Sequence, residues 1–315
     1  MDIVIALLAP GQGSQTPGML EPWLELDGAR HHIERWSEST GLDLLRLGTT
    51  ADKEEIKDTS VTQPLVVALS LLAAAELQRR AAFPVEAVVA GHSVGELAAS
   101  AVAGVLDFDD AVALAAVRGR EMAAACALEP TGMSAVLGGD RVAVLARLEE
   151  LGLAPANQNG SGQIVAAGKV SALEKLAADA PDGTRVRALP VAGAFHTRFM
   201  APAKESLSAY ADTVTAKDPS RVLLSNADGE SVDTGTTALG RLVDQVTKPV
   251  RWDSCMAALA TRGVRGVIEF PPAGTLAGMV KRELPEIARL PLKKPDDLDR
   301  VAEFLAENSK NGSAL

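Results

Sequence analysis

Short apolar runs rich in β-branched residues alternate along this chain with longer stretches of helical composition. Runs of this kind, bounded by Gly, Pro and polar clusters, are typical of buried strands, and they lie at residues 3–8, 85–90, 222–225, 264–269 and 287–292. Strands separated by helices form a mostly parallel sheet covered on both faces. The pattern therefore predicts a large α/β domain.

The pattern changes between residues 130 and 191. Here the chain predicts, in order, a strand, a helix, two strands, a helix and a strand, at 133–139, 142–152, 154–160, 163–169, 171–180 and 185–191. This βαββαβ order is that of a ferredoxin-like unit. We therefore expect 130–191 to be an inserted ferredoxin-like subdomain, with 1–129 and 192–307 forming the large domain. The small polar residues at 308–315 predict a disordered tail.

Composition restricts the function. With 315 residues, 47% apolar and 23% charged, the chain is long enough for a full core and has the make-up of a soluble globular protein. Aromatic residues are only 3% and the net charge is −10, which argues against a nucleic-acid partner. The N-terminal apolar run lacks a basic flank and is too short to span a bilayer, so we expect no membrane partner.

The two cysteines, Cys126 and Cys255, are far apart in the sequence and form no CxxC motif. We therefore expect neither a disulfide framework nor a metal site, and a reducing cytoplasm is the simplest compartment.

Residues 90–96, AGHSVGE, follow the strand predicted at 85–90 and precede a helix predicted at 94–105. Gly-x-Ser-x-Gly between a strand and a helix is typical of the nucleophile elbow of α/β-hydrolase-like domains, in which a sharp turn exposes the serine. Ser93 is thus a candidate nucleophile. A plain glycine turn explains this motif alone equally well.

A serine nucleophile needs a base, and the chain has only four histidines. His31 and His32 fall on a predicted surface helix, and the side chain of His92, next to Ser93, is expected to diverge from it. His196 remains, where the chain rejoins the large domain; the alternative is a half-buried loop histidine. The acids between Ser93 and His196 fall mostly on solvated helix faces of the insertion, so we expect a neutral group to orient the histidine.

Two further groups fit acyl chemistry. The loop APGQGSQTPG lacks the G-x-G-x-x-G spacing of a dinucleotide site, but its Gln12 N–H, with that of Val94, is a candidate oxyanion donor. The alternative is a plain glycine turn. On the helix predicted at 107–127, Arg118 lies on an otherwise apolar face, either extending to its edge or buried to bind an anion such as a carboxylate.

The motifs PGQGSQ, TQP (62–64), GHSVGE, RGREM and GAFHT, in this order, resemble the malonyl-coenzyme A:acyl carrier protein transacylases of bacterial fatty-acid synthesis and the related acyltransferase domains of polyketide synthases. The resemblance covers nearly the whole chain. It implies that Ser93 is acylated, that His196 is its base, and that Arg118 binds the malonyl carboxylate. It assigns the remaining roles as follows: oxyanion donors, Gln12 and Val94; a carbonyl that orients the histidine, Gln245; substrate contacts, Gln63, Phe195 and Asn159.

The resemblance also implies the reaction: malonyl-CoA donates its malonyl group to the phosphopantetheine thiol of an acyl carrier protein, through a malonyl-serine, in a monomer without cofactor or metal. In the family, a phenylalanine immediately before the histidine, here Phe195, is associated with selectivity for malonyl over methylmalonyl groups. The alternatives are an acyltransferase that serves a carrier of polyketide synthesis, a serine acyl hydrolase or editing thioesterase, and a non-catalytic carrier-docking module.

Two positions depart from the family: Lys248 stands where Asn is common, and 270–274 (FPPAG) replaces Gly-Pro-Gly. Basic residues proposed at the rim of the site are Arg185, Arg187, Lys281 and Arg282.

Overall fold

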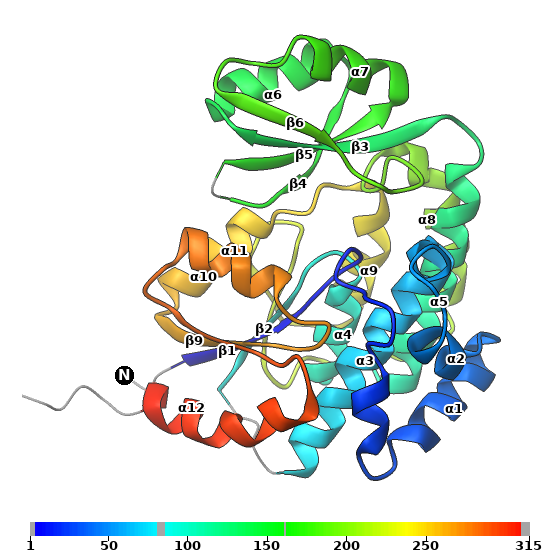
Figure 1. Cartoon of the computed structure of the whole chain (residues 1–315), viewed down its shortest axis with the longest axis vertical. Coiled ribbons are helices and arrows are strands. Elements are labelled where there is room, and N and C mark those ends of the chain that lie inside the picture. Colours follow the sequence, from blue (N-terminus) through cyan, green and yellow to red (C-terminus); the bar gives the residue numbers. More distant parts are fainter. Residues whose placement is uncertain (1–3, 81–85, 161, 310–315) are drawn as a thin grey trace, which may run out of the picture.

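The computed structural model describes residues 4–80, 86–160 and 162–309, which form two lobes, the smaller above the larger in Figure 1. The larger lobe contains a six-stranded sheet in the order β10-β9-β1-β2-β7-β8. All neighbours are parallel except β7 and β8. The strands are β1 Val4–Ala9, β2 Val88–Gly91, β7 Val222–Leu224, β8 Ser231–Val232, β9 Val264–Glu269 and β10 Ala288–Pro291.

Alternation along β1 divides the core of this lobe between the two faces of its sheet. Leu7 belongs to the large cluster shared with α3, α4 and α5, whereas Leu8 belongs to a second cluster with α10 and α11. The helices of the large lobe are α1 Ala29–Thr40, α2 Leu44–Thr49, α3 Thr59–Arg79, α4 Gly95–Val102, α5 Phe108–Cys126, α8 Ala201–Ala211, α9 Gly235–Asp244, α10 Trp252–Thr261, α11 Thr275–Glu283 and α12 Val301–Ser309, with short 3₁₀ turns η1 Glu21–Glu25, η2 Glu55–Lys57, η3 Arg198–Met200, η4 Gln245–Thr247 and η5 Pro295–Arg300.

Helix α3 is long and apolar enough to cross a membrane by length and composition, but 83% of its apolar window is buried inside the protein. It packs against α5 and α4 in the large core. Its composition is therefore that of a core helix, and it gives no evidence of membrane insertion.

The smaller lobe is a four-stranded antiparallel sheet in the order β4-β5-β3-β6, with α6 and α7 on one face. Its elements are β3 Thr131–Gly138, α6 Arg141–Glu150, β4 Ala154–Gln158, β5 Gln163–Lys169, α7 Val170–Ala178 and β6 Thr184–Ala188. The other face, with Met133 and Val165, looks onto the large lobe. Two main-chain hydrogen bonds join the lobes, Gln158 N–H to Val250 O (2.9 Å) and Val250 N–H to Ala156 O (2.8 Å).

The predicted α/β class with a small inserted sheet is confirmed, but some element bounds differ. The second strand begins at Val88, later than predicted, and Val85 lies outside the described residues. Strand β8 was not predicted, because two residues are too few for a periodic signal. Residues 308 and 309 are helical rather than part of a tail, since Asn308 Nδ2 donates to Phe304 O (2.8 Å) in the last turn of α12. The rest of the predicted tail, 310–315, lies outside the described residues.

Candidate active site

Ser93 lies in the sharp turn between β2 and α4, with a backbone φ of 55°. Among the described residues only Ser93 and His196 (φ 61°) combine a side chain with a positive φ, a strained conformation that clusters at functional sites. The flanking glycines are required sterically: a Cβ on Gly91 would lie 2.1 Å from Gly95 O, and one on Gly95 would lie 2.2 Å from Ala9 O. The turn therefore has the geometry of a nucleophile elbow.

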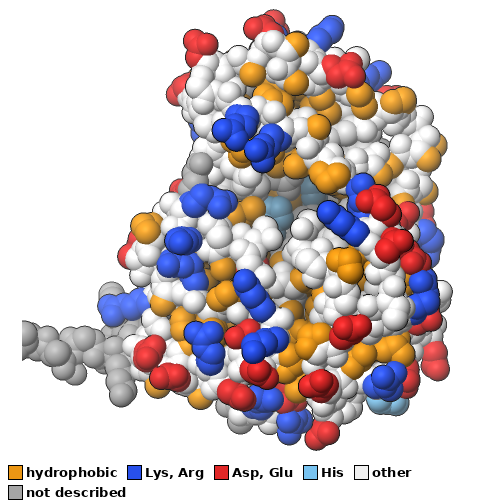
Figure 2. Space-filling model, viewed as in Figure 1, with side chains coloured by type: hydrophobic (Ala, Val, Ile, Leu, Met, Phe, Trp, Pro, Cys, Tyr) orange, Lys and Arg blue, Asp and Glu red, His pale blue; other side chains and the backbone are white. Residues whose placement is uncertain are grey.

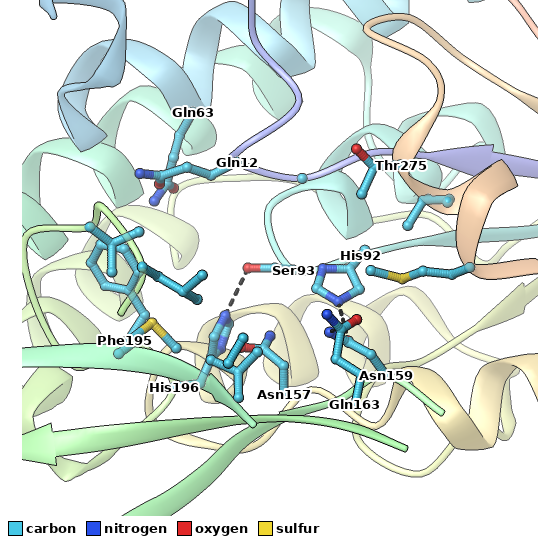
Figure 3. A pocket seen from close by; sticks show the side chains of 18 of the residues that line it. Gln12, Gln63, His92, Ser93, Asn157, Asn159, Gln163, Phe195, His196 and Thr275 are labelled. Atoms are coloured by element: carbon cyan, nitrogen blue, oxygen red, sulfur yellow. Dashed lines mark hydrogen bonds between the residues drawn. The ribbon is translucent and has the colours of Figure 1, made fainter. Parts of the chain in front are cut away.

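Ser93 and His196 form a hydrogen-bonded pair, with 2.8 Å between Oγ and Nε2 (Figure 3). The other ring nitrogen, Nδ1, lies 2.8 Å from the main-chain oxygen of Gln245. Because a carbonyl only accepts, Nδ1 carries the proton and Nε2 is left to accept from the serine hydroxyl. Among the described residues no carboxylate hydrogen-bonds to His196, so a neutral group orients it.

Burial, together with the positive charge of Arg118, lowers the pKa of His196 to about 3. The ring is 3% exposed. The resting histidine is therefore neutral throughout the physiological range, the form that can accept a proton.

The N–H groups of Gln12 and Val94 are available to a ligand. In the part of the chain that the structure describes, neither donates a hydrogen bond to a protein atom. Val94 immediately precedes α4, so its N–H lies at the positive end of that helix. The Gln12 loop is held in place because its side-chain Nε2 donates to Thr59 Oγ1 (3.2 Å). Val94 directly follows Ser93, and Gln12 lines the same cavity as the serine, so the two N–H groups remain candidates for an oxyanion hole.

Arg118 is buried in α5, 2% exposed, with its guanidinium close to the serine. Nη1 donates to Gln63 Oε1 (2.6 Å), and Nη2 donates to Gln245 Oε1 (3.0 Å) and, at 3.4 Å, towards Ser93 Oγ. Within the described residues these partners include no carboxylate. Burial lowers the pKa of Arg118 to about 10, so it stays charged. A buried cation held by neutral amide oxygens is a site for an anionic group.

A cavity of about 210 Å³ opens between the lobes above Ser93. Figure 2 shows the hollow, with histidine side chains visible inside and Lys and Arg side chains on both lobes around it. Phe195, 6% exposed, lines its apolar side together with Met122, Met133, Leu189 and Val191. On the polar side Asn159 accepts a hydrogen bond from His92 Nε2 (2.9 Å). It lies across the cavity from Phe195 (Figure 3).

Most residues assigned from the sequence line one cavity: Gln12, Gln63, Ser93, Arg118, Asn159, Phe195 and His196. Val94, Gln245 and the proposed basic rim residues do not line it. Gln63 contacts Arg118 as well as the cavity, and Gln245 serves twice, through its main-chain oxygen and its amide. His31 and His32 lie on α1, away from this site. Arg120 is paired with Glu121 at the surface.

Two residues behind the serine were not identified from the sequence. Asn226 Oδ1 accepts from Ser93 N–H (2.8 Å), and its Nδ2 donates to Gly91 O (2.8 Å). Glu96 is 4% exposed, and burial raises its pKa to about 7. Asn226 follows β7 at the carboxyl edge of the sheet, where ligands bind in α/β folds, so its position was a usable signal.

No group of three or more His, Cys, Asp or Glu residues is arranged for a metal ion among the described residues. Cys126 and Cys255 are free thiols.

The Ser93–His196 pair, with its neutral orienting group, suits acyl transfer. The chain belongs to the family of acyl transferase domains, and the match covers residues 7–311. Over 300 residues it is 60% identical to the malonyl CoA-acyl carrier protein transacylase of Mycobacterium tuberculosis, covering 95% of this chain and 99% of that protein.

Solved structures of transacylases resemble this chain as well. The crystal structure of MCAT from Mycobacterium tuberculosis superposes with a TM-score of 0.92 at 60% identity, over 95% of this chain and 99% of that chain. A malonyl-transacylase solved in complex with its type II PKS acyl-carrier protein gives a TM-score of 0.88 at 29% identity, over 96% of this chain and 99% of that chain.

Proposed function

We propose that this chain transfers the malonyl group of malonyl-CoA to the phosphopantetheine thiol of an acyl carrier protein. The observation that carries the proposal is Arg118, a buried cation that hydrogen-bonds to no carboxylate among the described residues and lies 3.4 Å from the hydroxyl of Ser93. A planar guanidinium matches a carboxylate, so the site selects an acyl group that ends in one. The relatives that carry the name malonyl CoA-acyl carrier protein transacylase support the same activity.

In the first half-reaction His196 Nε2 takes the hydroxyl proton as Ser93 Oγ attacks the thioester carbonyl. The oxyanion of the tetrahedral intermediate is bound by the N–H groups of Gln12 and Val94. The carbon–sulfur bond then breaks, and His196 gives its proton to the departing coenzyme A thiolate. The product is a malonyl ester on Ser93.

The second half-reaction runs these steps in reverse with a new thiol. The phosphopantetheine thiol of the carrier gives its proton to His196 and attacks the ester, and Ser93 recovers its proton. Because an ordinary thiol has a pKa of about 8.5, little basicity is needed, which suits a histidine without an acidic partner. Each proton and charge is handled by this chain, so we propose that no resident cofactor takes part.

Substrate binding itself helps the base. The charge of Arg118 lowers the pKa of His196. A malonyl carboxylate bound to Arg118 offsets that charge. It therefore raises the pKa of His196 before His196 takes the proton of the Ser93 hydroxyl. A carboxylated acyl group is thereby favoured in the chemical step as well as in binding.

Acyl shape is set by the apolar wall. Phe195 occupies the space that an α-methyl group would need, which favours malonyl over methylmalonyl. One methyl group is typically worth about 1 to 3 kcal/mol in such discrimination. Gln63 and Asn159 border the polar part of the cavity and are proposed as further substrate contacts.

The acceptor is proposed to approach through the hollow between the lobes. Arg185, Arg187, Lys281 and Arg282 are candidates for contacts with an acidic carrier, on β6 and at the end of α11. One structural relative is complexed with a polyketide carrier, so both fatty-acid and polyketide carriers are candidate acceptors. We propose a monomer in the cytoplasm, where the free thiols of Cys126 and Cys255 stay reduced.

Mass spectrometry tests the function. Incubation with malonyl-CoA is expected to add one malonyl mass to the wild type and none to Ser93→Ala; labelling of that variant would contradict the nucleophile. Coenzyme A release is then followed with and without a carrier protein. Sustained turnover that requires the carrier supports transfer, whereas equal turnover without it would identify a hydrolase. Carrier binding without labelling would identify a docking module.

A further inference from the structure

Glu96 is a buried carboxylate for which the steps above have no use. It lies in the first turn of α4, three positions after Ser93, and its side chain is 4% exposed. Oε1 accepts from the main-chain N–H of Asn226 (2.9 Å), and Oε2 accepts from Nε2 of Gln245. Among the described residues no Lys or Arg hydrogen-bonds to it. In the ionised form, which prevails above its pKa of about 7, both oxygens act as acceptors for neutral donors.

The amide of Gln245 has a single orientation in this network. Its Nε2 faces two acceptors, Glu96 Oε2 and Asn226 Oδ1 (3.1 Å). Its Oε1 is consequently turned to Arg118, from which it accepts a hydrogen bond (3.0 Å). If the amide were reversed, its NH₂ would face the guanidinium, donor against donor, and its oxygen would face the carboxylate.

Resting on the proposed function, we propose that Glu96 is a positioning residue: through the Gln245 amide it holds Arg118 where the malonyl carboxylate binds, and so it sets the preference for malonyl over acetyl groups. Glu96 contacts neither substrate nor reacting atoms. The main-chain oxygen of Gln245, which orients His196, is independent of the amide orientation. Disturbing Glu96 therefore leaves the carbonyl that orients His196 in place, but it disturbs the acceptor that fixes the amide bound to Arg118.

Glu96→Gln is the sharpest test because it keeps shape and removes the second acceptor. The new side chain has one acceptor for two donors. If its oxygen stays on Asn226 N–H, its NH₂ faces that of Gln245, the Gln245 amide turns and Arg118 loses a partner; if its oxygen pairs with Gln245, the N–H of Asn226 loses its acceptor instead. We expect kcat/KM for malonylation of Ser93 to fall by about 10- to 100-fold, the range of one hydrogen bond to a charged group. Acetylation from acetyl-CoA, which needs no carboxylate site, is expected to change less than about threefold.

A double-mutant cycle tests whether Glu96 acts through Gln245. Gln245→Ala removes the amide and keeps the main-chain oxygen, and it is expected to lower the malonyl-to-acetyl ratio to a similar extent. The combined variant is expected to lose no more than either single one, because both act on the same contact. Ratios that multiply in the combined variant would overturn the proposal.

Two further variants complete the design. Glu76→Gln is the control: Glu76 is equally buried, at 5% exposed, but lies at the far end of α3 with Arg79 and Arg80, and the ratio should stay at the wild-type value. Glu96→Asp keeps the charge and withdraws it by one methylene group, so it is expected to lower the ratio even if Glu96→Gln does not fold. A wild-type ratio in Glu96→Asp, or equal losses of malonylation and acetylation in Glu96→Gln, would overturn the proposal. Absence of Ser93 acylation in the wild type would instead contradict the proposed function.

Discussion

His196 and Glu96 are buried groups whose pKa values are shifted in opposite directions. Each shift should appear in the pH dependence of the free energy of unfolding. Burial lowers the pKa of His196 from 6.5 to about 3 and raises that of Glu96 from 4.5 to about 7. Between pH 4.5 and 6.5 the unfolded chain therefore binds a proton at His196 that the native protein does not. In the same range the native protein binds a proton at Glu96 that the unfolded chain does not.

The sign follows from proton linkage. Where the unfolded state binds more protons, the free energy of unfolding rises with pH, by about 1.4 kcal/mol per pH unit for one proton. His196 thus contributes stability that is present above its unfolded pKa of 6.5 and is lost as the pH falls towards 3, roughly 2 kcal/mol of it over the two units from 6.5 to 4.5. Glu96 contributes a change of similar size and opposite sign, because its stabilisation is present below pH 4.5 and is lost as the pH rises through 7. In the wild type the two contributions offset each other.

Single variants separate them. The free energy of unfolding is measured by urea titration at several pH values between 4.5 and 6.5. Relative to the wild type, His196→Gln is expected to lose roughly 2 kcal/mol as the pH rises across this range, and Glu96→Gln to gain roughly 2 kcal/mol. Glu76→Gln is the control, since hydrogen bonding to Arg79 lowers the pKa of Glu76, the opposite direction to that of Glu96. A constant difference between His196→Gln and the wild type would show that His196 titrates normally, and would refute the argument that it rests as a neutral base.

The other predictions concern acyl selectivity and folding. Arg118→Ala is expected to lower kcat/KM for malonyl-CoA by about 10- to 100-fold and shift preference towards acetyl-CoA, measured by coenzyme A release; an unchanged ratio would count against the carboxylate site. Phe195→Ala is expected to reduce discrimination against methylmalonyl-CoA by about tenfold, in a competition followed by intact mass; unchanged discrimination would mean that another side chain excludes the methyl group. Gly95→Ala places a Cβ 2.2 Å from Ala9 O and is expected to lower Tm and abolish Ser93 labelling, while Gly240→Ala, where a Cβ meets nothing within 4 Å, is the matched control. Normal labelling of Gly95→Ala would show that the elbow tolerates a wider turn.

The parts of the site that depend on neighbouring residues could be predicted from the sequence. The elbow is marked by a local motif, because a Cβ on Gly91 would meet Gly95 O four residues later, although Gly95 itself is required by the distant Ala9 O of β1. His196 was accessible by elimination, since the chain has few histidines.

The network behind the serine could not be predicted in this way. The hydrogen bond from Asn226 to Glu96 joins residues 130 positions apart, and that from Gln245 joins residues 149 apart. The partner of the histidine is a main-chain oxygen, which any residue carries, so without the family resemblance no side chain marks it. In the fold, periodicity indicated the long strands, whereas β8 was too short to leave a pattern.

The manner in which the small lobe is joined has a consequence for how this protein can be altered. The chain leaves and re-enters the large lobe at adjacent points, because Ala194 N–H donates to Thr131 Oγ1 (3.1 Å) and Leu189 N–H donates to Met133 O (2.9 Å). Ser93, His196 and Arg118 all belong to the large lobe, while Met133 and Val165 of the cavity wall come from the small one. The segment between the two junctions is therefore an exchangeable unit. Replacing it with that of a relative would change the shape of the cavity wall around the acyl chain and leave the proton-transfer groups in place.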